Sequence, residues 1–336
     1  MTRLRLPQSL SPILLVLWTS SGCVASPHPP PHEPEKPAHL MGPGDLQALP
    51  SNAPDWRVAY GTDSSQYGEL RVPAGPGPHP VVVLVHGGCF KAAYATLRDL
   101  APMADALKKA GVATWNIEYR RIGQSGGGWP GTYLDVGQAV DYLRVLASQH
   151  ALDLGRVVIV GHSAGGHLAT WAAARTRVPA GSAIHFDEPL QVRGVLDLAG
   201  PLDLTANIAG YERLCRDTVI TGLIGGTPAA VPERYAQASP MQLLPLGVPQ
   251  VLLIGDREEF VPRPFAEAYV RAAAQAGDSV RLIVVPEVGH FEIASPRASP
   301  WPRVESAIES LLDGRLPSDG PPHPVCCSAR SVSRRS

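Results

Sequence analysis

The sequence has no excess of charge of either sign. Its 336 residues include 29 lysines and arginines and 30 aspartates and glutamates, which gives a formal net charge of −1 at pH 7. Composition therefore gives no reason to expect nucleic acid or an anionic surface as a partner. The sequence also lacks C-x-x-C pairs and any metal-ligand spacing among its histidines. We therefore expect no metal site and no cofactor.

The sequence also has no long apolar run at its N-terminus. Arg3 and Arg5 precede a short apolar segment, 13–18, and small residues then lead to Cys23. This pattern is typical of an export signal, and the apolar segment is too short for a membrane-spanning helix. The letters SSGC resemble a bacterial lipobox, in which the cysteine becomes the lipidated first residue. We expect a signal over 1–23 and an exported protein, lipid-anchored in the outer membrane or periplasm or otherwise secreted.

The two ends of the chain differ in composition from its middle. Residues 24–54 are rich in proline and have little to bury, so we expect a disordered linker there. Residues 317–336 show no periodic apolar pattern and are expected to form a disordered tail. A single catalytic domain is expected over 55–316. Within it lie Cys89 and Cys215, which could form a disulfide in an exported protein or remain two buried thiols.

Short apolar runs alternate with longer helical patterns through the expected domain. Runs that are apolar on both faces suit parallel strands covered by helices, so the alternation predicts a mostly parallel α/β sheet. The expected strands are 81–86, 112–117, 156–161, 192–200, 249–255 and 280–286. Helical patterns include 97–111 and 133–150, and glycines suited to helix C-caps stand at Gly111, Gly277 and Gly314. The segment 201–245 is too short for a large lid and is expected to line a pocket.

The segment GHSAG, residues 161–165, follows one expected strand and precedes a helical pattern. It fits G-x-S-x-G, and this context is the one that a nucleophile elbow requires. Ser163 would occupy a strained turn, and bulky residues two positions away on either side would clash. The backbone N–H of Ala164 would point to the same place, near the positive end of the helix.

A second glycine turn, in LVHGGCF at 84–90, follows another expected strand. Its backbone N–H groups at Gly88 or Cys89 are candidates for the other half of an oxyanion hole.

A serine nucleophile needs a base and a carboxylate that orients the base. His290 follows the strand expected at 280–286 and is the only histidine between His185 and the C-terminal tail, so we assign it as the base. The strand expected at 249–255 is followed by three candidate acids, Asp256, Glu258 and Glu259.

Taken together, these motifs resemble the α/β-hydrolase superfamily. The resemblance is to its bacterial esterase/lipase group, which includes arylformamidase-like and carbohydrate-esterase-like (BD-FAE-like) hydrolases. The matching stretches span about 58–312 and include HGGCF, EYRR, RVVIVGHSAGGHLA, GDREEFVP and GHFEIA. Related sequences read G-x-x-D-x-x-V-P at the acid, which places Glu258 at that position and leaves Asp256 as the runner-up. The resemblance implies an α/β-hydrolase fold with helices on both faces of the sheet.

The resulting prediction is a serine esterase that cleaves a small-molecule carboxylic ester through an acyl-enzyme intermediate. An arylformamidase-like amide hydrolase is one alternative, and a catalytically inactive surface binding protein is another. The oligomeric state is left open.

Several neighbouring residues are expected to have structural roles. Glu118 or Arg120 of EYRR is expected in an ion pair behind the oxyanion turn. Trp129 and Pro130 are expected either to pack or to edge the acyl or alcohol pocket. Packing is the preferred interpretation for His162 and His167 on either side of the serine.

Overall fold

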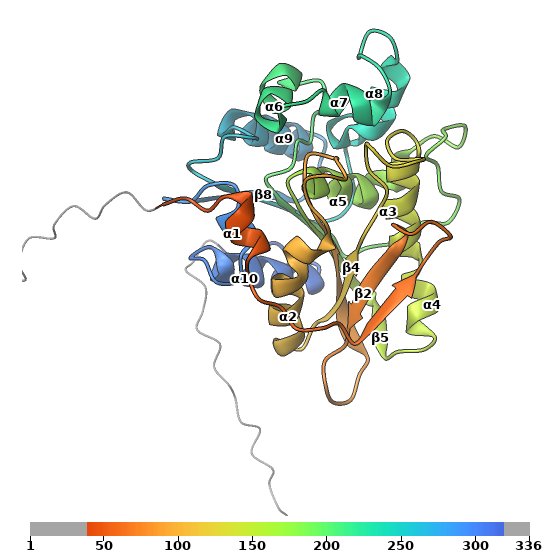
Figure 1. Ribbon diagram of the computed structural model, residues 1–336, viewed down its shortest axis with the longest axis vertical. Coiled ribbons are helices and arrows are strands. Elements are labelled where there is room, and N and C mark those ends of the chain that lie inside the picture. Colours follow the sequence, from red (N-terminus) through yellow and green to blue (C-terminus); the bar gives the residue numbers. More distant parts are fainter. Residues whose placement is uncertain (1–38, 319–336) are drawn as a thin grey trace, which may run out of the picture. The chain divides into compact units, whose positions relative to one another are not determined.

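The computed structural model describes residues 39–318 (Figure 1). Their strands form one eight-stranded sheet in the order β1-β2-β4-β3-β5-β6-β7-β8. The last six strands run parallel, and β1 and β2 add antiparallel pairs at one edge. The strands are β1 (Trp56–Ala59), β2 (Tyr67–Arg71), β3 (His79–Val85), β4 (Ala113–Ile117), β5 (Leu152–His162), β6 (Gly194–Leu198), β7 (Gln250–Gly255) and β8 (Val280–Val285).

Each of the six parallel strands overlaps one of the apolar runs, so the prediction of a mostly parallel sheet is confirmed. The strands β1 and β2 were not predicted from the sequence. Both are short, and β1 is largely exposed, so neither carries the continuous apolar run that marks a covered parallel strand.

Ten α-helices connect and cover the strands within residues 39–318. They are α1 (Pro43–Gln47), α2 (Ala101–Lys109), α3 (Gly131–Asp141), α4 (Leu143–Ala147), α5 (Ala164–Ala174), α6 (Ile208–Cys215), α7 (Val219–Ile224), α8 (Pro232–Ala238), α9 (Arg263–Gln275) and α10 (Trp301–Leu312). Short 3-10 helices lie at 97–100, 175–177, 240–243 and 292–294. Gly111, Gly277 and Gly314 end helices with positive φ, as predicted.

The central strand β3 shows how the sheet separates two apolar layers. Successive side chains of a strand point to opposite faces. Here Val83 belongs to the apolar layer that includes α3, α4 and α5, whereas Leu84 belongs to the layer that includes α2, α9 and α10. The helices α6, α7 and α8 between β6 and β7 join the first of these layers. Figure 1 shows these three helices grouped together at the top of the view.

The second half of the expected linker is packed rather than disordered. Residues 39–54 include α1, whose Leu46 is 1% exposed and joins the apolar layer of α2 and α10. The backbone N–H of Met41 donates a hydrogen bond to the Glu292 carboxylate. The prediction of a disordered linker is therefore wrong for this half, because one buried leucine and a few polar contacts suffice to fix a short segment.

The remaining predictions for the chain ends, the signal and lipobox at 1–23 and most of the tail, lie outside the described residues. None of the helices in the described part, 39–318, is long and apolar enough to cross a membrane.

Candidate active site

Ser163 stands between the end of β5 and the start of α5, at the bend expected of a nucleophile elbow. Its φ is +56°, a conformation that costs free energy for any residue with a side chain. Its backbone N–H donates a 2.8 Å hydrogen bond to the carbonyl of Leu198 at the end of β6. The neighbouring strand thus holds the strained turn in place.

The glycines on either side of the elbow are required by the close approach of the backbone. A Cβ atom at Gly161 would lie 2.0 Å from the carbonyl oxygen of Gly165, and one at Gly165 would lie 2.0 Å from that of Val85. Since these neighbours are backbone atoms of the sheet and the elbow, they cannot move aside without distorting both. The steric reason given for this motif is confirmed.

His290 follows β8, and its Nδ1 lies 2.8 Å from Oε2 of Glu258. The other carboxylate oxygen of Glu258 accepts the backbone N–H groups of Phe260 at 2.7 Å and Val261 at 3.2 Å. Asp256 lies exposed, with its carboxylate 3.4 Å from the N–H of Val288. The structure therefore pairs the histidine with Glu258 and not with the runner-up Asp256.

The glycine turn after β3 lies against the elbow. Gly88 and Cys89 both have positive φ, and both line the same cavity as Ser163 and His290. Together with the amide of Ala164, at the first position of α5, these backbone groups are available as donors to an oxyanion.

A buried ion-pair network supports this turn from behind. Oε1 of Glu118 lies 3.0 Å from Nε2 of His86 and 2.6 Å from the guanidinium of Arg121. Burial raises the pKa of Glu118, but His86 and Arg121 outweigh it and hold this pKa below its usual value. The predicted ion pair at Glu118 is confirmed, with Arg121 as its partner, whereas Arg120 pairs with Asp135 at 2.7 Å.

The two histidines beside the serine are buried and neutral. His162 lies 2.9 Å from the backbone carbonyl of His290, so it fixes the loop that carries the base. His167 lies 2.9 Å from both the Pro201 carbonyl and the Tyr133 hydroxyl. Burial lowers the pKa of His162 to about 3 and that of His167 to about 4. Both side chains are packing residues, as expected.

Trp129 is also a packing residue, since its ring lies 5.9 Å from that of Tyr133 and 5.6 Å from the guanidinium of Arg234.

The cavity above Ser163 has a volume of about 530 Å³, within the range of small-molecule sites. Its walls come from the glycine turn, α1, α6 and the loops after β7 and β8. The larger apolar side chains in these walls are Leu46, Tyr94, Leu214, Phe260 and Phe291. Asp99 adds a buried carboxylate whose pKa is raised by burial. Within residues 39–318, no cluster of three or more His, Cys, Asp and Glu side chains is arranged to hold a metal ion.

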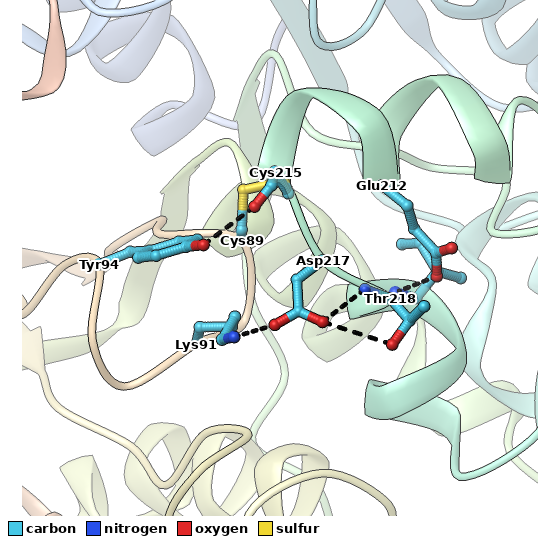
Figure 2. Close-up of a disulfide and its surroundings, with 8 residues drawn as sticks. Cys89, Lys91, Tyr94, Glu212, Cys215, Asp217 and Thr218 are labelled. Carbon is cyan, nitrogen blue, oxygen red and sulfur yellow. Dashed lines mark hydrogen bonds and ion pairs between the residues drawn. A yellow bond between two sulfur atoms is a disulfide. The ribbon is translucent and has the colours of Figure 1, made fainter.

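Cys89 and Cys215 form a disulfide, which settles the alternative that the sequence left open. It joins the glycine turn to the end of α6 (Figure 2). Two further contacts reinforce it: the Tyr94 hydroxyl donates a 3.0 Å hydrogen bond to the carbonyl of Cys215, and Lys91 forms an ion pair with Asp217. This clamp fixes one wall of the cavity to the turn that carries the candidate oxyanion donors.

Two parts of the site were not found from the sequence. One is α1, which lay in the expected linker and yet forms part of the cavity wall. The other is α6, whose Leu214 and Cys215 line the cavity, although the segment 201–245 was expected only in general terms to line a pocket. Neither belongs to a motif.

Comparison with known proteins agrees with this geometry. Residues 70–270 match the family described as BD-FAE. The chain belongs to the BD-FAE family. This match covers more than half of the chain and includes the elbow, the glycine turn and Glu258, although it ends before His290.

Among curated proteins, this BD-FAE member is similar to Esterase LipC of Mycobacterium tuberculosis, with 26% identity over 239 residues. The aligned region covers 70% of this chain but only 59% of LipC.

Two solved structures show the same fold. One is a truncated carbohydrate esterase from gut microbiota, with 22% identity, a TM-score of 0.64, and coverage of 76% of this chain and 95% of that one. The other is a bifunctional GH43-CE protein from Bacteroides eggerthii, with 21% identity, a TM-score of 0.63, and coverage of 77% and 38%. The α/β-hydrolase fold predicted from the motifs is therefore confirmed.

The disulfide should contribute strongly to stability because it closes a loop of 126 residues. Loop closure of this length restricts the unfolded chain, so the double variant C89A/C215A should lose about 2–5 kcal/mol of unfolding free energy. Urea denaturation measures the loss. Reducing agent should lower the urea midpoint of the wild type toward that of the variant and leave the midpoint of the variant unchanged. Equal midpoints for wild type and variant without reducing agent would contradict this account.

Proposed function

We propose that this protein is a serine esterase, with Ser163 as nucleophile, His290 as general base and Glu258 as the acid that orients the base. The observation that carries the proposal is the convergence of three features on one cavity. A serine on a strained elbow, a buried histidine–carboxylate pair and a turn that offers backbone N–H groups all meet there.

The hydrogen bond between His290 and Glu258 defines which ring nitrogen acts as the base. Nδ1 faces a carboxylate, so in the neutral ring it carries the proton and donates it to Glu258. The lone pair of Nε2 then accepts the proton of Ser163 as Oγ attacks the ester carbonyl. Glu258 stabilises the imidazolium that results.

The backbone N–H groups of Ala164 and of Gly88 or Cys89 stabilise the negative charge that develops on the carbonyl oxygen. The imidazolium returns its proton to the leaving alcohol, and an acyl-enzyme on Ser163 remains. In a second cycle His290 activates water, which attacks the acyl group and releases the acid.

The cavity favours a small carboxylic ester as substrate. Its walls are mainly apolar, and its volume of about 530 Å³ suits a drug-sized or smaller molecule. The names of the relatives support the same reaction type, since LipC is called an esterase and the gut-microbiota protein a carbohydrate esterase.

A short-chain p-nitrophenyl ester tests the proposal. The wild type should release p-nitrophenol, and S163A should lose at least about 10⁴-fold in kcat because the nucleophile is removed. A fluorophosphonate probe should label the wild type but not S163A. If the wild type shows neither turnover nor labelling, the protein is a binding protein on a hydrolase fold and the proposal fails.

The acid assignment has its own test. E258Q should lose on the order of 10³- to 10⁴-fold in kcat, because an amide cannot stabilise the imidazolium and can favour the wrong tautomer. D256N is the matched control, since Asp256 is exposed and should leave kcat within a few-fold of the wild type. Full activity in E258Q together with loss in D256N would reverse the assignment.

We also propose that the protein is exported and anchored by a lipid on Cys23. The disulfide supports this because such bonds persist in oxidising compartments. The full chain, expressed in a Gram-negative bacterium, should fractionate with the membranes and incorporate labelled palmitate. C23A should lose the label and move to the soluble fraction; label retained by C23A would contradict lipidation at this residue.

A further inference from the structure

Tyr211 on α6 has a buried hydroxyl that lacks a well-formed hydrogen bond within the described part of the chain. The side chain is 3% exposed. No group among residues 39–318 forms a hydrogen bond of good geometry with its oxygen. A buried polar group without a partner costs about 1–3 kcal/mol, and such groups are rare in folded proteins. A substrate atom that accepts a hydrogen bond from this hydroxyl would offset the cost.

The ring of Tyr211 lies among aromatic residues that adjoin the candidate catalytic groups. Its ring lies 6.4 Å from that of Phe90, the residue that follows the candidate oxyanion turn. It lies 6.4 Å from the ring of Phe260, which stacks on His290 at 4.3 Å. Burial raises the pKa of Tyr211, and the nearby Ser163 hydroxyl acts in the opposite direction.

The clamp at the end of α6 holds Tyr211 in this position. Cys215 follows Tyr211 by four residues, so the two lie on the same face of the helix. Its disulfide to Cys89 draws that face toward the glycine turn (Figure 2). The donors of the turn and the hydroxyl of Tyr211 are therefore linked through one covalent bridge, although they are far apart in sequence.

We propose that the Tyr211 hydroxyl is a third donor to the reacting carbonyl oxygen, beside the backbone N–H groups of the elbow and the glycine turn. The proposal rests on the serine-esterase function proposed above. Tyr211 donates a hydrogen bond and keeps its proton throughout, since the buried phenol remains neutral at assay pH. The bond strengthens as the carbonyl oxygen gains negative charge, so it stabilises the transition state more than the bound ester.

The variant Y211F removes this hydroxyl and nothing else. With a p-nitrophenyl ester, we expect kcat and kcat/KM to fall on the order of 10²-fold with little change in KM, as for loss of one oxyanion donor. The urea midpoint should stay equal or rise, because an unpaired polar group is replaced by an apolar one of the same shape.

Y235F is the matched control. Tyr235 on α8 is equally buried at 2% exposure, but its hydroxyl donates a 3.0 Å hydrogen bond to the carbonyl of Gly226, on the chain between α7 and α8. This variant should lose stability and keep its activity, the reverse of Y211F.

A pair of acetate esters separates a role at the carbonyl oxygen from a role at the leaving group. In kcat/KM, which reports acylation, Y211F should lose the same factor with p-nitrophenyl acetate and with ethyl acetate. A loss confined to ethyl acetate would mean that the hydroxyl serves the leaving alcohol, and it would overturn the proposal. So would wild-type kcat/KM in Y211F, or a loss of activity that only parallels a loss of stability.

The failure of this proposal is distinguishable from failure of the function itself. Ser163-dependent turnover in the wild type, with a fully active Y211F, overturns the role of Tyr211 alone. Absence of Ser163-dependent turnover overturns both.

Discussion

The strained turn at Ser163 is the constraint on which the rest of the site depends. It can form only where three backbone segments pack without a side chain between them. Gly165 lies against the end of β3, and the Ser163 amide is bound to the end of β6. The strained turn therefore depends on a formed sheet. Strand pairing and the buried apolar layers on either face of the sheet supply the free energy that offsets the cost of the strain.

Parallel pairing also explains why distant segments of the chain meet at this elbow. The glycine turn, Ser163, Glu258 and His290 follow β3, β5, β7 and β8 respectively. Since parallel strands present their carboxyl ends at one edge of the sheet, the four segments share that edge whatever their separation in sequence. The buried pair of Glu118 and Arg121, which follows β4, lies at the same edge and supports the turn. The α/β order of the chain thus produces the site.

The features predictable from the sequence were those with a local signal. Covered parallel strands have apolar runs, and the elbow needs its glycines, so both could be found from residue types and spacing. Three features had no such signal. The short helix α1 is anchored mainly by Leu46, the pairing of Cys89 with Cys215 depends on how α6 folds back, and the position of Tyr211 depends on the same fold. These are tertiary contacts between segments more than 40 residues apart, and periodicity contains no information about them.

Glu258 stands where related sequences have an aspartate, so a longer side chain has to orient the imidazole of His290. In this protein the carboxylate is fixed at both oxygens, one by His290 and the other by the amides of Phe260 and Val261. The extra methylene therefore adds reach without adding freedom. A second carboxyl, Asp197, lies nearby on β6, where burial and the charge of Glu258 raise its pKa well above the usual value and favour its neutral form. A second negative charge beside the pair of Glu258 and His290 is thereby disfavoured.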